Sequence, residues 1–566
     1  MSPLAARWSP APAVVTAADD LLVGPVLKRW SDQHFAVAMS GGRISLAVDE
    51  DLVVAVEGRL DDAGGGPSAS LGAADAVTAQ WRRSGAAVLD ELLGDFLIVV
   101  YDRATRRVTA GRDIVGARPG FVSTSRGEHL VFTHLAGVAE KRGFDLVPDH
   151  NWTASYLRGD WPDAILTPYH GVSALLPGHI AVPYGLGWEQ SRVCEWQIEE
   201  PSKLSVEAAS DGFRDRFDAA VLARIGDVDG PVAVATSGGL DSTSALVTAR
   251  AIRPDADLVA LAIPFTDPEG DERHLQVEAA AKAGARLHWV DISERGPFGS
   301  GPDEVFGRFG APPLAPNWFF FSSIEQAALE AGVLQILDGE DADGVLSGNL
   351  GFLADLVARG QWITWTREAL ALRRVHDVRL EVLYRRSRVS LRRVGRAGGI
   401  GGPTARFATG RRGYVSSGGY LTRLMECTYD ESTAVAGGMA HPFLDRRVVE
   451  YALALSWDHI VKGGKSKIVL RNAMRGRLPE SIRNRSGKAR LSAPFERMVT
   501  GSQRSWLDEG LALARRDRSG TFDAVDWTKY AESAKAGDTF PLFRVAMVAL
   551  WHEWIAAAAP GGIQSR

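Results

Sequence analysis

Cysteine is nearly absent from this sequence, whose 566 residues contain only Cys194 and Cys427. Two cysteines cannot build a disulfide framework, and neither belongs to a pair with metal-ligand spacing. A strong charge of either sign is also lacking, since 64 basic and 69 acidic residues leave a formal net charge of −5. This balance excludes a globally basic surface for nucleic acid or anionic membranes. We therefore expect a cytoplasmic protein with no nucleic-acid partner.

Long apolar runs are missing as well. Residues 1–20 contain no basic cluster followed by an apolar stretch, so we expect no signal peptide. The most apolar window, residues 541–560, is interrupted by Arg544, His552 and Glu553. These charges break it well short of a membrane span, and it is predicted to be a final helix packed in the core. The sequence therefore predicts no membrane partner.

Length and residue pattern divide the chain into two predicted domains, 1–204 and 205–566. A single core seldom organises a chain of this length. The first part has short β-like runs separated by turn residues, whereas the second alternates helical stretches with single apolar strands, as a parallel sheet covered by helices does. The polar segment 198–205 is the predicted linker. The predicted strands lie in 43–48, 52–58, 96–102, 129–134, 179–185, 230–239, 257–265, 286–292 and 334–340.

The segment VAVATSGGLDSTSAL, residues 232–246, has the pattern of a phosphate-binding loop between a strand and a helix. The residues expected to hold phosphates are Ser237, Gly238, Gly239, Leu240, Asp241 and Ser242. Glycines let the backbone turn its N–H groups toward an anion, and the helix presents its positive end. A carboxylate beside phosphates would be repelled unless a divalent cation lay between them. We therefore predict that Asp241 binds Mg²⁺.

A second, acidic loop follows the apolar segment that ends at residue 337. Its carboxylates, arranged around Gly339, are Asp338, Glu340, Asp341 and Asp343. Carboxylates this close raise one another's pKa values unless a cation compensates them. A cation shared by Asp241 and Asp343 would do so, although acidic residues that merely decorate a surface turn are the alternative.

Two basic features complete the pattern. Lys467 and Arg471 are four residues apart and would share one face of a helix, where they could stabilise a phosphate leaving group or a tetrahedral intermediate. Solvated helical cations are the alternative. Residues 367–412 contain about a dozen arginines and three acidic residues. This stretch is either a solvated insertion or a surface for an acidic partner.

In order and over nearly the full length, these motifs resemble the asparagine synthetase superfamily. SGGLDS (237–242) looks like its pyrophosphate loop, and DGEDADG (338–344) is similar to its SGEGADE loop. HPFLDRRVVEYALAL (441–455), KIVLR (467–471) and LWHEW (550–554) resemble later motifs. GDFLIVVYD (94–102), GRDIVGARPGFV (111–122) and YHGVSALLPGH (169–179) look like the glutaminase-type part. The resemblance implies an α/β protein with an N-terminal glutaminase-like (Ntn-type) β-sandwich and a C-terminal synthetase domain of the adenine-nucleotide α-hydrolase type, with a parallel sheet.

The resemblance also implies a reaction in which ATP activates a carboxyl group as an acyl-adenylate, pyrophosphate leaves, and an amine attacks. Carried over by position, residues 237–242 hold the phosphates and Asp241 and Asp343 bind Mg²⁺. Glu340 would orient or deprotonate the amine and Lys467 would stabilise developing charge. Asp338, Gly339 and Arg471 are further positions expected at the ATP site, and Asp341 replaces a family glycine.

The glutaminase-like part departs from the family at three positions. The nucleophilic cysteine at position two is here Ser2. The family's oxyanion-hole stretch N-G-E-I-Y-N corresponds to residues 57–62, EGRLDD, and the carboxylate of Glu57 would repel an oxyanion. The family's substrate-binding aspartate corresponds to Leu93. We therefore expect that this chain does not hydrolyse glutamine and that its amine has another source.

Superfamily members without the glutaminase nucleophile include β-lactam synthetases and lasso peptide cyclases. We favour a lasso peptide cyclase, which adenylates an Asp or Glu side chain of a precursor peptide and joins it to the N-terminal amine of the core peptide. The tyrosine–glutamate arrangement of β-lactam synthetases is not evident, and the arginine-rich stretch suits a peptide. The expected cofactors are ATP and Mg²⁺, and the expected partners are a precursor peptide, a leader peptidase and a peptide-recognition protein. The alternatives are a β-lactam-synthetase-like or ammonia-dependent asparagine-synthetase-like ligase, or a silent nucleotide-binding scaffold.

Overall fold

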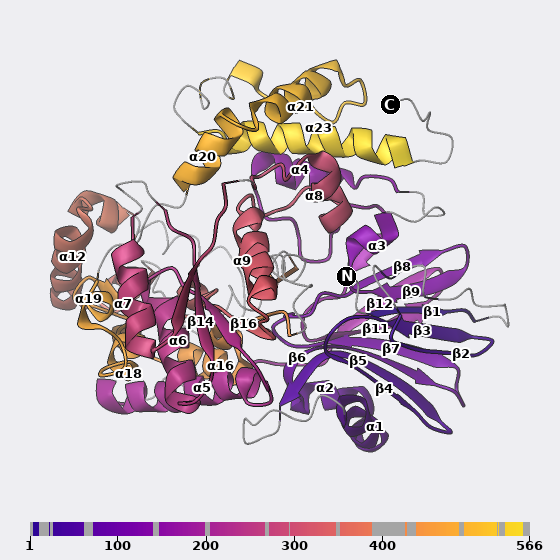
Figure 1. Ribbon diagram of the computed structural model, residues 1–566, viewed down its shortest axis with the longest axis horizontal. Coiled ribbons are helices and arrows are strands. Elements are labelled where there is room, and N and C mark those ends of the chain that lie inside the picture. Colours follow the sequence, from indigo (N-terminus) through magenta and orange to yellow (C-terminus); the bar gives the residue numbers. More distant parts are fainter. Residues whose placement is uncertain are drawn as a thin grey trace.

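The protein consists of a β-sandwich beside a helix-covered parallel sheet, with further helices lying across both (Figure 1). The computed structural model describes residues 4–10, 18, 22, 26–61, 72–139, 146–198, 204–265, 271–293, 295–346, 351–385, 387, 425–426, 437–485, 492–523, 525–528, 530, 532 and 538–558. Ser2, Cys427, the proposed linker between 199 and 203, and the arginine-rich stretch beyond residue 387 lie outside the described residues.

Two six-stranded antiparallel sheets form the sandwich, in the orders β10-β8-β9-β1-β3-β2 and β12-β11-β7-β6-β5-β4. Apolar side chains such as Phe35, Val53 and Val99 alternate into the space between the sheets. The predicted strands of this domain are confirmed as β4, β5, β6, β9 and β11. The strands are β1 (Leu4–Trp8), β2 (Lys28–Ser31), β3 (Phe35–Met39), β4 (Ile44–Val48), β5 (Leu52–Asp61), β6 (Leu93–Asp102), β7 (Arg107–Arg112), β8 (Phe121–Ser125), β9 (Glu128–Phe132), β10 (Val172–Ala174), β11 (His179–Tyr184) and β12 (Gly187–Arg192).

The second unit contains a five-stranded parallel sheet in the order β15-β14-β13-β16-β17. Its strands are β13 (Val232–Ala235), β14 (Leu258–Ala262), β15 (Arg286–Trp289), β16 (Gln335–Leu337) and β17 (Met439–Ala440). The first four confirm the predicted strands, whereas the two-residue β17 is too short to be recognised from sequence. The chain runs outward from β13 to β15 and then returns to place β16 on the other side of β13. Ligands of such sheets bind at this switch in strand order, beyond the carboxyl ends of the strands.

Helices cover both units. They are α1 (Ala73–Ser84), α2 (Val88–Glu91), α3 (Leu135–Ala139), α4 (His150–Arg158), α5 (Val206–Ile225), α6 (Leu240–Ile252), α7 (Arg273–Ala283), α8 (Pro302–Phe309), α9 (Trp318–Glu330), α10 (Ala342–Leu346), α11 (Gly351–Ala358), α12 (Trp362–His376), α16 (Arg446–Ala454), α17 (Trp457–Ile460), α18 (Ile468–Ala473), α19 (Glu480–Arg483), α20 (Ser492–Thr500), α21 (Arg504–Arg516) and α23 (Phe540–Ala558), with short 3-10 turns η3 (Gly85–Ala87) and η4 (Pro442–Leu444) and a hairpin of β18 (Val461–Lys462) and β19 (Lys465–Ser466).

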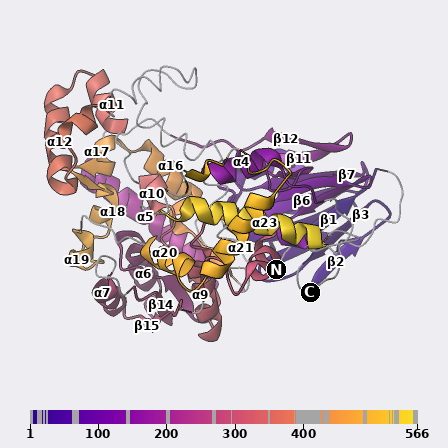
Figure 2. The same cartoon turned by 90° about the horizontal axis from the view of Figure 1, so that it is seen from above.

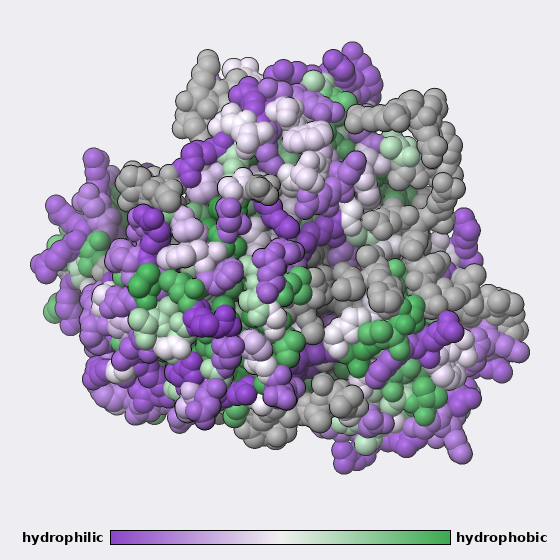
Figure 3. Space-filling view, viewed as in Figure 1, coloured by the Kyte–Doolittle hydropathy of each residue, from purple (hydrophilic) through white to green (hydrophobic). Residues whose placement is uncertain are grey.

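Helix α23 is the final helix predicted from the sequence, and it lies over both units (Figures 1 and 2). Trp551 packs against the rings of Trp152 and Tyr169 from the first part of the chain. Its indole N–H donates to the carbonyl of Gly310, 3.2 Å away, in the second part. Among the described residues, no helix is both long and apolar enough to cross a bilayer. Hydrophilic side chains cover much of the face in Figure 3, and hydrophobic groups gather both over the sandwich and over the parallel-sheet unit.

Candidate active site

The phosphate-loop segment 237–242 joins β13 to α6 at the switch in strand order. Gly238 has φ +75°, and a Cβ there would crowd Leu275 and the backbone of Gln276, so the position requires glycine. The backbone N–H of Ser237 donates to the Ser242 hydroxyl at 3.1 Å, and the two hydroxyl oxygens are also 3.1 Å apart. The loop therefore closes on itself at the N-terminus of a 13-residue helix, where N–H groups favour an anion.

The acidic loop follows β16 and touches the phosphate-loop segment directly. A Cβ on Gly339 would overlap the backbone of Asp241 and Ser242, so only glycine allows the two loops to meet. Asp341 adopts φ +59°, the left-handed conformation that aspartate tolerates better than most residues. The aspartate that replaces a family glycine thus stands at a left-handed position.

Lys467 brings the two loops together electrostatically. Its ammonium lies 2.6 Å from Oδ2 of Asp241 and 2.7 Å from Oδ1 of Asp343. The lysine side chain is buried, with 3% exposure, while that of Asp343 is 53% exposed. Asp343 therefore faces solvent on one side and the ammonium on the other.

The predicted helical pairing of Lys467 with Arg471 is wrong, because Lys467 precedes α18 as its N-cap residue at φ +57°. The guanidinium of Arg471 donates to the carbonyls of Ser466 and Arg483 instead. Arg471 therefore fixes the turn that carries Lys467. It also lies within electrostatic reach of the Asp241 carboxylate, and its expected place at the ATP site stays a prediction.

The carboxylates predicted to share Mg²⁺ do converge on one cationic group. The ammonium of Lys467 occupies the position between Asp241 and Asp343 where a shared cation would lie. Oxygen donors suit Mg²⁺, which binds through one or two carboxylates and completes its coordination with phosphate and water oxygens. Among the described residues, no cluster of three or more histidine, cysteine or acidic side chains forms a metal cage. The donor set therefore fits a metal that arrives with a nucleotide.

Glu340 lies next to a buried pair in which Asp338 was predicted as a site residue and His441 was not. Burial, assisted by the neighbouring Asp338 carboxylate, raises the pKa of Glu340 to about 7, and the charge of His441 opposes that rise. Nδ1 of His441 lies 3.0 Å and 2.9 Å from the two carboxylate oxygens of Asp338. Burial alone would lower the pKa of His441, but the Asp338 carboxylate outweighs it and the net shift is upward. The only sequence signal for this pair was a histidine at the start of the HPFLD motif.

The stretch that corresponds to the family's oxyanion-hole segment carries side chains that form ion pairs with their neighbours. Glu57, which stands in the oxyanion-hole stretch, lies 3.5 Å from the guanidinium of Arg118. The next positively charged side chain, Arg59, forms ion pairs with Asp61 and, at 2.8 Å, with Asp95. Burial opposes ionisation of Asp95, yet two guanidinium groups hold its pKa well below the usual range.

That network continues into the second unit. Arg224 of α5 pairs with Asp445 at 2.8 Å and with Asp95 at 3.4 Å. Arg447 pairs with Asp445 at 2.6 Å and with Asp61 at 2.7 Å. The HPFLDRR motif thus connects the ATP-site strands to the sandwich through buried charges.

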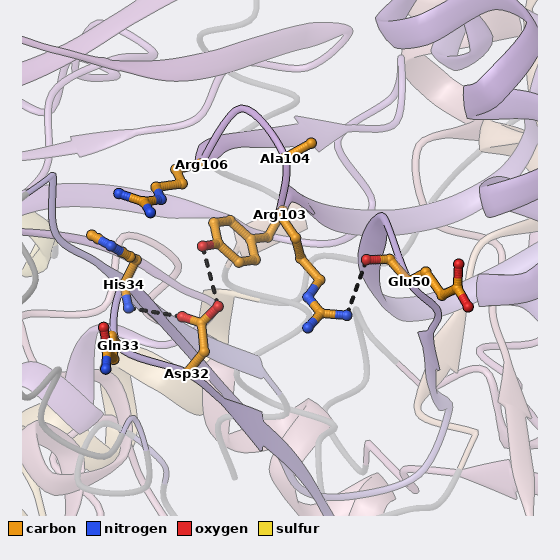
Figure 4. A pocket seen from close by; sticks show the side chains of 8 residues that line it. Asp32, Gln33, His34, Glu50, Arg103, Ala104 and Arg106 are labelled. Carbon is orange, nitrogen blue, oxygen red and sulfur yellow. Dashed lines mark hydrogen bonds between the residues drawn. The ribbon is translucent and has the colours of Figure 1, made fainter.

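A shallow cavity of about 410 Å³ lies far from these residues, at the turns of the sandwich (Figure 4). Its lining includes Asp32, His34 and Arg103, and the Tyr101 hydroxyl donates to Asp32 at 3.3 Å. None of the predicted site residues lines this cavity.

Comparison with known proteins agrees with this architecture. The asparagine synthase family model matches residues 212–553, and a glutamine amidotransferase domain model matches residues 65–191. Since the first match covers more than half of the chain, the protein belongs to the asparagine synthase family. It combines an N-terminal domain of the glutamine amidotransferase type with a C-terminal asparagine synthase domain.

Several relatives share part of the chain. Amidase chyE of Penicillium rubens is 27% identical over 302 residues, which are 50% of this chain and 44% of that protein. Amidase chry2 of Gibberella zeae is 25% identical over 299 residues, covering 49% of this chain and 43% of the relative. The glutamine-hydrolyzing asparagine synthetase 3 of Bacillus subtilis is 22% identical over 425 residues, covering 70% and 66%. The chain spans less than half the length of the first two relatives.

Proposed function

We propose that this protein is an ATP-dependent lasso peptide macrolactam synthetase. It would adenylate an Asp or Glu side chain of a precursor peptide and join that side chain to the N-terminal amine of the core peptide. The observation that carries the proposal is the contrast between a cation-binding ATP site and a glutaminase region filled by ion pairs.

The proposed reaction has two steps. The peptide carboxylate attacks the α-phosphorus of ATP, and the bond to the β-phosphate oxygen breaks to release pyrophosphate. The peptide amine then attacks the acyl carbon, loses a proton and expels AMP, so that one amide bond forms. Bound Mg²⁺ would neutralise phosphate charge beside Asp241 and Asp343.

The chain's own residues have distinct roles in these steps. The glycine-containing loop 237–242 would hold the phosphates by its N–H groups. Lys467 would leave the carboxylate pair to stabilise charge on the leaving pyrophosphate or on the tetrahedral intermediate. Glu340, whose pKa is about 7, is suited to take the proton from the attacking amine near neutral pH.

The glutaminase region supports a peptide amine rather than glutamine as the nitrogen source. An oxyanion is stabilised by hydrogen-bond donors, whereas the strand at residue 57 presents a carboxylate already engaged by Arg118. Leu93 offers no charge for the ammonium group of a glutamine substrate. Both features argue against glutamine hydrolysis and leave an amine within the substrate itself.

Exposed basic residues support a peptide as the substrate. Helix α12 presents exposed Arg367, Arg373 and Arg374, and the following sequence to residue 412 continues the excess of arginine. Such a surface suits an acidic segment of a precursor or its recognition protein. A small metabolite would not require it.

The test is mass spectrometry of a candidate core peptide incubated with the protein, ATP, Mg²⁺ and the leader-processing proteins. We expect a product lighter by one water, resistant to carboxypeptidase, with AMP and pyrophosphate formed. ATP turnover dependent on ammonium and aspartate, with peptides unchanged, would instead identify an ammonia-dependent asparagine synthetase. Conversion of a carboxyethyl amino acid to a lactam would identify a β-lactam synthetase.

A further inference from the structure

His441 and Asp338 form a buried pair that none of the assigned roles explains. The residues are 103 positions apart in the chain, and their relative exposures are 6% and 3%. They meet because β16 and β17 are parallel neighbours, with Leu337 opposite Ala440, so both side chains leave the sheet at adjacent carboxyl ends. The pair therefore lies at the start of the acidic loop.

Asp338 transmits this contact to Glu340. Its Oδ1 accepts the backbone N–H of Glu340 at 3.1 Å, while the same carboxylate is held by Nδ1 of His441. Its own backbone N–H donates to the carbonyl of Ala440 at 3.3 Å. The first turn of the acidic loop is thus tied to β17 through Asp338.

The loop is consequently held by a basic side chain at each end. Lys467 holds Asp343 at the far end, and His441 holds Asp338 at the near end. Between them, Gly339 rests against the backbone of Ser242. Glu340 lies in this doubly anchored segment, and neither anchoring contact was predicted from the sequence.

We propose that His441 is a positioning residue that fixes Glu340 for the attack of the amine, acting through Asp338. The imidazole does not touch the reacting atoms in this account. It orients the Asp338 carboxylate, which in turn holds the backbone from which the Glu340 side chain projects. This inference rests on the two-step adenylate mechanism proposed above.

Charged side chains from several elements surround Glu340 and the His441–Asp338 pair. Asp338, Asp341 and Asp343 face Glu340 from its own loop, and Asp95 and Arg224 act from the sandwich and α5.

His441→Asn places an amide N–H near the position of Nδ1, so it retains the donor. His441→Phe keeps a ring of similar shape and removes the donor.

Hydrogen exchange of the metal-free protein tests the anchor without any substrate. In His441→Phe we expect the Glu340 amide to exchange about ten-fold faster, the effect of losing one hydrogen bond. His441→Asn should restore most of the protection. The matched control is His459→Phe, which removes another buried histidine bonded to the Leu204 carbonyl, and it should leave residues 338–346 unchanged.

The half-reactions test the consequence. With ATP, Mg²⁺ and the core peptide, we expect His441→Phe to lower amide formation at least ten-fold while ATP–pyrophosphate exchange changes less than two-fold. His441→Asn should recover most of the amide formation. Should His441→Phe fail to fold, His441→Gln is the second variant, because its side-chain amide lies one bond farther from the backbone than Nδ1 of histidine. In His441→Gln we expect amide formation to fall about three-fold, with ATP–pyrophosphate exchange again little changed.

Two results would overturn the inference. One is unchanged exchange at Glu340 in both His441→Phe and His441→Gln. The other is an equal loss in both half-reactions that tracks a general loss of stability, as a structural residue would give. Absence of ATP–pyrophosphate exchange in the wild type would instead contradict the proposed function. The hydrogen-exchange result would then still test whether His441 holds the backbone of Glu340.

Discussion

The two sites of this protein treat charge in opposite ways. In the sandwich and at its junction with the second unit, four arginines face four carboxylates. They are Arg59, Arg118, Arg224, Arg447, Glu57, Asp61, Asp95 and Asp445. At the strand ends of the parallel sheet, five carboxylates face two basic side chains among the described residues, Lys467 and His441. The first region is internally balanced, whereas the second is short of positive charge.

This difference has a physical meaning for function. A buried network with balanced charge has little affinity for an added ligand, because its charged groups already form hydrogen bonds and ion pairs with one another. A site with surplus carboxylates raises the affinity for a divalent cation and for the nucleotide that accompanies it. The buried ion pairs therefore stabilise the junction between the sandwich and the second unit, whereas the carboxylates at the strand ends retain an affinity for a cation.

The largest expected effect comes from the carboxylates that Lys467 bridges. Asp241→Ala and Asp343→Ala should each lower product formation at least about 100-fold, because the cation that offsets phosphate charge loses a ligand. Product assays and circular dichroism check activity and fold. Asp257→Ala, at the opposite end of the same sheet in an exposed pair with Arg286, is the control. Retained activity in either test variant would contradict the shared-cation assignment.

Removing the bridging cation should separate turnover from binding. Lys467→Met is expected to lower kcat about 100-fold and to change ATP affinity only a few-fold, because its ammonium acts on charge that develops during reaction. In the absence of nucleotide, the same variant should bind Mn²⁺ more tightly than the wild type, since the two carboxylates are released. Electron paramagnetic resonance measures the free Mn²⁺. A loss confined to ATP affinity would refute this role.

Substitutions in the ion-pair network between the sandwich and the second unit should lower the free energy of unfolding. Arg224→Met leaves Asp95 and Asp445 buried beside one cation fewer and should cost about 3–5 kcal/mol of unfolding free energy. The matched variant Arg286→Met breaks the exposed Asp257 pair and should cost less than about 1 kcal/mol. Chemical denaturation checks both. Equal small losses would show that the inner network contributes no more than a surface pair.

A smaller expected effect is the pH dependence of stability that the raised pKa of Glu340 causes. Its folded pKa of about 7 exceeds the ordinary glutamate value of 4.5, so the folded state binds the proton more tightly and loses stability as pH rises between these values. Glu340→Gln removes this loss, and its stability relative to wild type should increase by about 2 kcal/mol between pH 5 and pH 8. Thermal unfolding without metal measures it, with exposed Glu330→Gln on α9 as control. A flat difference would place Glu340 in a more solvated setting.

Contiguous motifs account for most of what the sequence predicted. The strand and loop at 232–242 and the acidic loop after β16 are local patterns, and parallel topology brings both to one edge. His441 could not be paired with Asp338, because their contact depends on the register of a two-residue strand. The left-handed turn at Lys467 and the network of arginines from four distant segments depend likewise on tertiary packing. The domain boundary near residue 204 stays a prediction.

One isotope experiment tests the central claim that the amine belongs to the substrate peptide. The protein would be incubated with ATP, Mg²⁺, the leader-processing proteins, the core peptide and glutamine carrying ¹⁵N in its amide. We expect a peptide lighter by one water, without ¹⁵N, and no release of glutamate. A linear peptide whose carboxyl has become a ¹⁵N amide, with glutamate formed, would show a working glutaminase and contradict the account.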